Sequence, residues 1–473
     1  MGSQIAVRRP AGFEAPHPPQ HARILAETLD GRFMWRLICP ANGQITAVPV
    51  SMSPPMQSMA GRQPADQVTV RRSNLALVLR QLRDAGPRSR ARIAVETGLN
   101  KGTVSSLVSE LVARGLAREG QIQREGSVGR PAQMVELDGR GICGIGVEIN
   151  VDYLTALVLD LTNAVAFEQR VALDVQALPA DAVLDAVTDL AARAVRECAR
   201  LDMVPVGMTL AIPALVDVAA GIVAFAPNLH WREVPVVAGM VDRLTVRLGR
   251  PAFPIQVDND AKLAALGEYA MGSVAGTPDL VYLTGETGVG GGVMVGGRLL
   301  RGAEGFSGEI GHIPLDPAGH VCGCGRRGCW ETMVGLGGLL RLAATADDPV
   351  RDPSLDLVQR LDMICRRAEL GDQRTLDALG QVGAALGLGA SILINVFNPK
   401  ALVLGGYFAS LGPYLLGPAM TELRARVIAP DIGGCRVELS RLGFTAASRG
   451  GAHVAFEAVL DDPTLVALPA PAQ

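Results

Sequence analysis

The sequence predicts a mixed α/β fold divided into at least two domains. At 473 residues the chain exceeds the length at which a single hydrophobic core stops growing. Hydrophobic residues make up 48% and charged residues 19%, which supplies enough apolar material for a globular core. The 55 glycines and the low aromatic content of 4% favour strands and helices joined by tight turns over an aromatic-rich sandwich.

The N-terminal segment, residues 1–66, differs from the rest of the chain. Prolines recur through it, and no apolar periodicity is sustained. We interpret it as a poorly ordered extension, or as translated sequence ahead of a true start at a methionine between residues 52 and 59. Within it, Arg23–Leu29 fits one or two turns of helix, and Phe33–Ile38 fits a short strand.

Two helices are expected after Arg71. Apolar residues at helical spacing predict the first one, and Ala85-Gly86-Pro87 ends it because glycine and proline stop helices. Ser89 caps a second, short helix. The glycine of Thr97-Gly98-Leu99 closes that helix in a tight turn.

A third helix and a hairpin follow. Asn100 caps the helix, whose valines and leucines recur at the i, i+3, i+4, i+7 spacing of one buried face. Gly115 follows the last turn as a left-handed cap. Two strand-like stretches, Leu116–Arg118 and Met134–Leu137, then flank a loop that contains Gly129-Arg130-Pro131. Helix, helix, glycine turn, helix and hairpin is the order of a winged helix-turn-helix.

The charge distribution supports DNA binding by this region, which we place at residues 67–138. Between Gln67 and Glu136 there are 12 Lys/Arg and 6 Asp/Glu, a net charge of +6. The whole chain carries 44 − 47 = −3, so the remainder carries 32 − 41 = −9. A basic block on an acidic body is expected where one module meets phosphate. The alternative is a packing unit of three helices with a solvated polar face; the basic excess, the turn and the Gly-Arg-Pro loop favour DNA.

Two parts of the winged helix are expected to touch operator DNA. Arg130, in the loop of the wing, suits a narrow minor groove, where the negative potential is strongest. The polar start of the third helix suits base edges and phosphates in a major groove. Its candidate residues are Asn100, Lys101, Thr103, Ser105 and Ser106.

Strands and helices alternate after Asp138-Gly139-Arg140-Gly141, which we interpret as a hinge. The alternation continues to about Leu460, without a repeat period. The first expected strands are Ile142–Ile149, Tyr153–Leu159 and Val171–Val175, followed by a helix at Asp181–Arg200 and a strand at Val206–Ala211.

A metal site is predicted where Cys322, Cys324 and Cys329 crowd into eight residues. Zinc prefers four soft or borderline ligands in a tetrahedron, and three cysteines with one histidine form a common structural set. Gly328 allows the chain to return Cys329 toward the ion. From spacing alone, both His312 and His320 are candidates for the fourth ligand. Four protein ligands leave no open position for water or substrate, so the set indicates a structural zinc ion and not a hydrolytic centre.

The other cysteines are scattered, so the chain lacks the framework of a disulfide-rich secreted domain. No run of 18 apolar residues and no N-terminal apolar signal segment occur. We therefore expect a cytoplasmic protein without a membrane partner.

Four motifs in this chain order resemble the ROK family of repressors, open reading frames and sugar kinases. They are Asp258-Asn259-Asp260-Ala261, Gly285-Glu286-Thr287-Gly288 with the glycines that follow, Gly308-Glu309-Ile310-Gly311-His312, and the Cys-Gly-Cys-Gly-x-x-Gly-Cys-x-Glu run. The resemblance runs from about Arg71 to Leu460. It implies a two-lobed, actin-like ATPase fold, related to ribonuclease H, over residues 142–461. The lobes would divide near residue 258, with a C-terminal helix returning to the first lobe and residues 462–473 as a tail.

The resemblance also implies a sugar site between the lobes. It favours His312 as the fourth zinc ligand, with the same side chain touching the sugar. Carboxylates and amides can donate to and accept from each hydroxyl of a sugar in fixed directions, so such a site discriminates strongly. Asn228 is a lesser candidate, and Asp258 or Asn259 can also serve as a helix N-cap. The residues implied to contact sugar are Asn259, Asp260, Glu309, His312 and Glu331.

The nucleotide side departs from the kinases of the family. Asp260 stands where those kinases hold their catalytic base. Their first phosphate loop, Asp-x-Gly-Gly-Thr, is here Glu148-Ile149-Asn150-Val151-Asp152, and their Gly-Thr-Gly is here Glu286-Thr287-Gly288. Gly405-Gly406-Tyr407-Phe408 lacks a further glycine. Lost glycines and added carboxylates both disfavour a triphosphate.

We therefore expect a sugar-responsive repressor, not an enzyme, that binds operator DNA as a homodimer or homotetramer. A monosaccharide effector would release it. Two alternatives stay open: a sugar kinase with an added DNA-binding domain, and a regulator controlled by a protein partner with a vestigial pocket. Xylose, glucose and an N-acetylated amino sugar all fit the inferred pocket chemistry, and activation is the alternative to repression.

Overall fold

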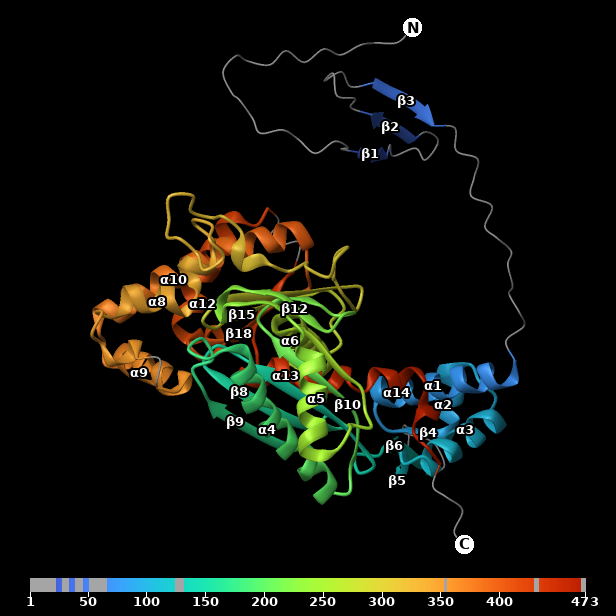
Figure 1. Ribbon diagram of the computed structural model, residues 1–473. Coiled ribbons are helices and arrows are strands. Elements are labelled where there is room, and N and C mark those ends of the chain that lie inside the picture. Colours follow the sequence, from blue (N-terminus) through green and yellow to red (C-terminus); the bar gives the residue numbers. More distant parts are fainter. Residues whose placement is uncertain are drawn as a thin grey trace. The chain divides into compact units, whose positions relative to one another are not determined.

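The computed structural model describes residues 66–123, 132–352, 355–428 and 434–468, together with three short strands nearer the N-terminus (Figure 1). The chain forms two compact units, Met1–Asp66 and Gln67–Gln473. In the first unit, β1 (Arg23–Glu27), β2 (Met34–Ile38) and β3 (Thr46–Val50) form an antiparallel sheet in that order.

Strand β1 corrects the prediction of helical turns at Arg23–Leu29. Each residue of β1 is paired with one of β2, from Arg23 opposite Ile38 to Glu27 opposite Met34. Pairing with a second strand overrides the local helix propensity of this stretch. The expected strand at Phe33–Ile38 corresponds to β2.

The winged helix-turn-helix forms as predicted. Ser89 and Asn100 cap their helices by accepting hydrogen bonds from the backbone N–H groups of Arg92 and Thr103. Gly98 and Gly115 take φ values of 72° and 70°, the left-handed conformation that each turn requires. The elements are α1 (Gln67–Ala85), β4 (Arg88–Ser89), α2 (Arg90–Thr97), α3 (Lys101–Ala113), β5 (Ala117–Gln123) and β6 (Ala132–Leu137), with the sheet order β4-β6-β5.

The body contains two five-stranded sheets with the same internal order. In each, the first strand pairs antiparallel with the second and parallel with the fourth. The first sheet, β14-β10-β7-β8-β9, contains β7 (Ile142–Ile149), β8 (Tyr153–Asp160), β9 (Val165–Ala172), β10 (Val204–Ile212) and β14 (Ile255–Asn259). The second, β17-β16-β15-β18-β19, contains β15 (Leu280–Gly285), β16 (Val289–Val295), β17 (Arg298–Leu299), β18 (Ala401–Gly406) and β19 (Arg436–Leu439).

Each sheet and the helices on it form one lobe, which confirms the expected two-lobed architecture. In the first lobe, α4 (Ala180–Arg200) packs on β8 and α5 (Val236–Leu248) packs on β14 (Figure 1). A small sheet of β11 (Leu215–Asp217), β12 (Ile222–Ala226) and β13 (Trp231–Val234) is added to this lobe. The second lobe adds α7 (Glu331–Val334), α8 (Leu336–Ala343), α9 (Leu357–Glu369), α10 (Gln373–Phe397), α11 (Tyr407–Ser410) and α12 (Gly412–Arg426).

Helix α13 (Ala446–Val454) connects the two lobes by packing on α6 (Asp260–Met271) and on β7, β8 and β10. The approach is close enough to require glycine. A Cβ atom on Gly146 would lie 1.7 Å from the carbonyl oxygen of Ser448, and one on Gly450 would lie 1.8 Å from that of Leu263. These glycines allow α13 to pack directly on the first sheet and on α6.

Helix α10 is long and apolar enough, by length and composition, to cross a membrane. Within its most apolar window, 56% is buried inside the protein. It packs against α8 and α12, and Trp330 donates a hydrogen bond from Nε1 to the carbonyl oxygen of Ala385 at 2.9 Å. These contacts are those of a core helix.

The winged helix shares a core with the first lobe. Leu82 of α1, Leu159 of β8 and Phe456 belong to one cluster of buried side chains. An ion pair adds to this contact between the winged helix and the C-terminal part of the chain. Arg80 of α1 lies 2.5 Å from Asp461 of α14 (Glu457–Asp461). The segment 138–141, interpreted as a hinge, therefore does not separate two independent cores.

Candidate functional site

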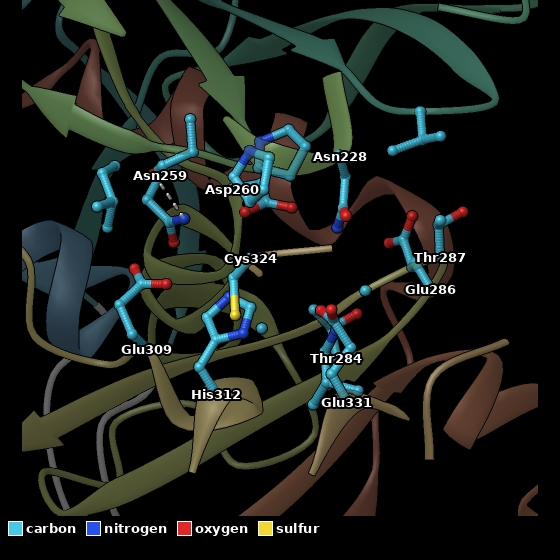
Figure 2. Close-up of a pocket in the computed structure, with 18 of the residues that line it drawn as sticks. Asn228, Asn259, Asp260, Thr284, Glu286, Thr287, Glu309, His312, Cys324 and Glu331 are labelled. Atoms are coloured by element: carbon cyan, nitrogen blue, oxygen red, sulfur yellow. Dashed lines mark hydrogen bonds between the residues drawn. The ribbon is translucent and has the colours of Figure 1, made fainter. Parts of the chain in front are cut away.

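A cavity of about 350 Å³ is lined by residues of both lobes. This volume falls in the range of roughly 300–1,000 Å³ that is usual for small-molecule sites. In Figure 2, Glu309 and His312 approach one side of the cavity, while Glu286 and Thr287 lie on the other. The polar lining consists of Asn150, Asn228, Asn259, Asp260, Thr284, Glu286, Thr287, Glu309, His312, Arg326 and Glu331.

Asn259 and Asp260 stand at the junction of β14 and α6. The Asn259 side chain caps α6: its Oδ1 accepts a hydrogen bond from the backbone N–H of Lys262 at 3.1 Å. Its Nδ2 donates to the carbonyl oxygen of Ala214 at 3.2 Å, so the amide orientation is fixed from both ends. Burial raises the pKa of the Asp260 carboxyl to about 6, against the opposing effect of backbone N–H groups at the helix start.

Glu309 and Glu331 supply two further carboxylates. Glu309 precedes a short 3₁₀ helix (Ile310–His312), and the surrounding protein raises its pKa, although the side chain stays exposed to the open cavity. Glu331 begins α7, and its Oε2 accepts a hydrogen bond from the backbone N–H of Val289 at 3.0 Å. Its Oε1 lies 3.2 Å from the sulfur of Cys322. Glu331 therefore links the cavity to the cysteine cluster.

The cysteine cluster lies beside the cavity. His312, Cys322, Cys324 and Cys329 place one ligand atom each within 4.8 Å of all the others. His320 is exposed and lines a separate groove, so the structure brings His312 into the set. Gly328 has a φ of 74°, and a Cβ there would lie 1.6 Å from the carbonyl oxygen of Asp316, so only glycine permits this return of the chain to Cys329.

The spacing of the cluster fits a tetrahedral metal ion. Nδ1 of His312 lies 3.6 Å from the sulfur of Cys322, and the sulfurs of Cys324 and Cys329 are 3.7 Å apart. Bonds of about 2.3 Å to sulfur and about 2.0–2.1 Å to nitrogen separate tetrahedral ligand atoms by roughly 3.5–3.8 Å. These two distances match a tetrahedral ion, and all four ligand atoms lie within 4.8 Å of one another.

On the opposite side of the cavity, the turns after β7 and β15 meet. Asn150 donates from Nδ2 to Oε2 of Glu286 at 2.6 Å, and Thr287 donates to Asp152 at 3.0 Å. Tyr153 donates to Oε1 of Glu148 at 2.9 Å. Burial, reinforced by the other carboxylates, raises the pKa of Glu148 to about 7 and that of Glu286 well above its usual value.

The expected DNA-reading side chains lie on the exposed start of α3. Lys101, Ser105 and Ser106 are exposed, while the apolar stripe that includes Val104 is fully buried. Asn100 is also exposed, but its Oδ1 is engaged as the cap by the N–H of Thr103 at 2.7 Å. Arg130 lies outside the residues that the structure describes.

The structure thus brings all five sugar-contact candidates into one cavity, together with the lesser candidate Asn228. Sequence reasoning missed Arg326 and the apolar wall that contains Pro213, Leu215 and Phe225. Arg326 stands inside the cysteine run, which was a usable signal. The apolar wall has no motif, because the small sheet that carries it becomes part of the cavity only through folding.

Comparison with known protein families assigns both parts of the chain. Residues 144–457 match the ROK family, and residues 73–120 match the IclR helix-turn-helix domain. The "Xylose repressor" of Bacillus spizizenii is 32% identical over 401 residues, which cover 84% of this chain and 98% of that protein. The "N-acetylglucosamine repressor" of Escherichia coli O157:H7 is 28% identical over 356 residues, which cover 73% of this chain and 83% of that protein.

Solved structures show the same fold. A ROK family transcriptional regulator, described as a homologue of the E. coli Mlc protein, superposes with a TM-score of 0.65 at 25% identity, covering 83% of this chain and 97% of its own. A ROK family glucokinase from Streptomyces griseus, in complex with glucose and AMPPNP, reaches a TM-score of 0.56 at 29% identity. It covers 66% of this chain and 98% of its own.

Proposed function

The chain belongs to the ROK family, and from this premise we propose that it is a transcriptional repressor that a monosaccharide releases from operator DNA. Relatives named as xylose repressors match it over nearly their whole length, and its residues 73–120 match a helix-turn-helix domain. The observation that carries the proposal is the cavity that unites three amides, four carboxylates and His312 beside the cysteine cluster.

In this proposal, Asn259, Asp260, Glu309, His312 and Glu331 bind the hydroxyls of the sugar. The two hydrogen bonds of the Asn259 side chain fix its amide before the ligand arrives, so little ordering is required on binding. Carboxylates accept hydrogen bonds, which suits the hydroxyl donors of a sugar. Xylose, glucose and N-acetylated amino sugars all present such hydroxyls.

Zinc is the metal that the cysteine cluster suits best, because its donor set is soft and closed. A bound zinc ion would fix the loop between Glu309 and Glu331. His312 would present its second ring nitrogen to the cavity, since Nδ1 faces Cys322. Its role is structural in this account.

We propose no kinase activity. The turn that would hold phosphate contains Asn150, Val151 and Asp152 in place of the glycines and hydroxyl of the kinases, and Glu286 adds a carboxylate to the second phosphate loop. The observation that favours a sugar kinase is Asp260, whose pKa of about 6 suits a general base. A coupled assay for ATP-dependent sugar phosphorylation, with Asp260→Asn as control, decides between the two functions.

Operator DNA would contact the exposed face of α3 through Lys101, Thr103, Ser105 and Ser106, with Asn100 at its start and Arg130 in the wing. A homodimer or homotetramer would present two such helices to a two-fold operator. Sugar binding would change the relation of the lobes and therefore the spacing of the two winged helices. By linkage, operator DNA must weaken sugar binding by the same factor.

Thermal unfolding against a panel of monosaccharides tests the ligand directly. A sugar present at 100 times its Kd stabilises the native protein by about 2.7 kcal/mol. For a chain of this size, whose entropy of unfolding is about 0.9 kcal/mol/K, the expected rise in Tm is roughly 3 °C. The corresponding sugar alcohols, which cannot close a ring, are the matched controls. A panel in which no sugar raises Tm, with metal content intact, contradicts the proposal and favours a regulator controlled by a protein partner.

A further inference from the structure

Two hydrogen-bonded pairs cross between the lobes on the side of the cavity opposite Glu309 and His312. Asn150 and Asp152 lie in the turn between β7 and β8 of the first lobe, and Glu286 and Thr287 lie in the turn between β15 and β16 of the second. The Asn150–Glu286 bond measures 2.6 Å and the Thr287–Asp152 bond measures 3.0 Å. We call these four residues the lobe clasp.

A fifth residue, Tyr153, braces the lobe clasp. The hydroxyl of Tyr153, a fully buried side chain, lies 2.9 Å from Oε1 of Glu148 and 3.2 Å from Oε2 of Glu286. The guanidinium of Arg170 stacks 3.8 Å from the centre of the Tyr153 ring and lies 3.7 Å from Asp356 of the second lobe. Side chains from both lobes therefore interlock on this side of the cavity.

Little space remains behind the lobe clasp. The chamber lined by Glu148, Asp260 and Glu286 has a volume of about 10 Å³, which is at the limit for a single water molecule. Oε2 of Glu148 faces no hydrogen-bond partner there. With the Asn150–Glu286 and Tyr153–Glu286 bonds in place, this chamber is too small for a phosphoryl group.

The lobe clasp opposes separation of the two lobes. The cavity is lined by Asn150 and Val151 from the first lobe and by Glu286 and Thr287 from the second. Separation of the lobes breaks both clasp bonds and leaves the Asn150 amide and the Asp152 carboxylate without these partners. Each such loss of a partner inside a protein costs free energy, so the bonds favour the closed form.

We propose that the lobe clasp joins the two lobes where a nucleotide would join them in a sugar kinase, so that closure of the cleft responds to sugar alone. The part of this inference that concerns sugar rests on the proposed function. The coupling between the clasp residues does not rest on the proposed function, because it depends only on contacts within this chain.

A double-mutant cycle tests the inference. Asp152→Ala and Thr287→Val each remove one end of the same bond, and calorimetry measures the Kd of the sugar selected by thermal shift. We expect each single variant to raise Kd by about five- to tenfold, and the double variant to raise it no further, because neighbouring residues in one bond are not additive. Asp152→Asn, which retains an acceptor oxygen, should restore Kd to within about twofold of the wild type.

The matched control is Thr245→Val, which removes an exposed threonine hydroxyl that bonds only within α5. It should leave Kd unchanged. Unchanged Kd in both single variants, or a double variant whose effect equals the product of the singles, overturns the proposal.

Thermal unfolding separates failure of the clasp from failure of the proposed function. If no sugar binds the wild type, the proposed function fails, but the cycle can still be measured as Tm without ligand. Non-additive losses of Tm for Asp152→Ala and Thr287→Val then support the clasp. Additive or absent losses overturn it.

Discussion

Glu309→Ala should produce a repressor that no longer responds to sugar but still binds its operator. Glu309 reaches the cavity from the position just before the 3₁₀ helix that carries His312, and its side chain is exposed there. Loss of a hydrogen bond to a charged group costs about 1.5–3 kcal/mol, which corresponds to a rise in sugar Kd of roughly 10- to 150-fold. Calorimetry measures that rise, and fluorescence anisotropy with labelled operator measures the unchanged DNA affinity.

Two variants sharpen this result. Glu309→Gln keeps the size of the side chain and mimics its protonated form, so it should lose less affinity than the alanine variant. Glu304→Ala removes an exposed carboxylate from the same loop that does not line the cavity, and should behave as the wild type. If sugar still releases the Glu309→Ala variant fully from its operator, Glu309 does not contribute to sugar binding.

Cys329→Ser should abolish metal binding and lower thermal stability more than any surface substitution. Cys329 is fully buried, and its sulfur lies 3.7 Å from that of Cys324. Because binding of a structural metal ion contributes directly to the free energy of folding, we expect Tm to fall by roughly 5–10 °C. Sugar binding should be lost as well, since the same loop carries His312 and Glu331.

Elemental analysis of the purified protein measures this prediction together with thermal unfolding. The wild type should carry one equivalent of zinc, and Cys329→Ser should carry none. Cys435→Ser is the control, because Cys435 is a half-buried cysteine outside the cluster. A wild type that contains no metal, or a serine variant that keeps both its zinc and its Tm, contradicts the assignment.

Local features of the fold were predictable because local chemistry determines them. The caps at Ser89 and Asn100 and the left-handed turn at Gly115 depend on residues within a few positions, and the structure has each of them. The strands Ile142–Ile149 and Val204–Ile212 were also expected, the latter with shorter bounds.

Features that depend on distant contacts were placed less well. The third strand was expected at Val171–Val175 but runs from Val165 to Ala172, because its register is set by pairing with β8. The wrong prediction of helical turns at β1 has the same cause, because this strand forms by pairing with β2. Strand register depends on a partner that periodicity alone cannot identify.

The same distinction holds for the candidate site. Asn259 and Asp260, and likewise Glu309 and His312, are neighbours in the chain, so their motifs could be recognised. The bond between Asp152 and Thr287 joins residues 135 positions apart. In the sequence, Asp152 indicated only a charge unfavourable for phosphate; in the folded protein it accepts a hydrogen bond from the other lobe.

Sugar binding in the cavity should control the affinity of the winged helix for operator DNA. The most direct test is the Kd for an operator selected in vitro, measured by anisotropy with and without the sugar that stabilises the protein. We expect sugar to weaken operator binding by about 5- to 150-fold, the range of coupling free energies of about 1–3 kcal/mol. A sugar that binds the cavity tightly but leaves the operator Kd unchanged would contradict the account.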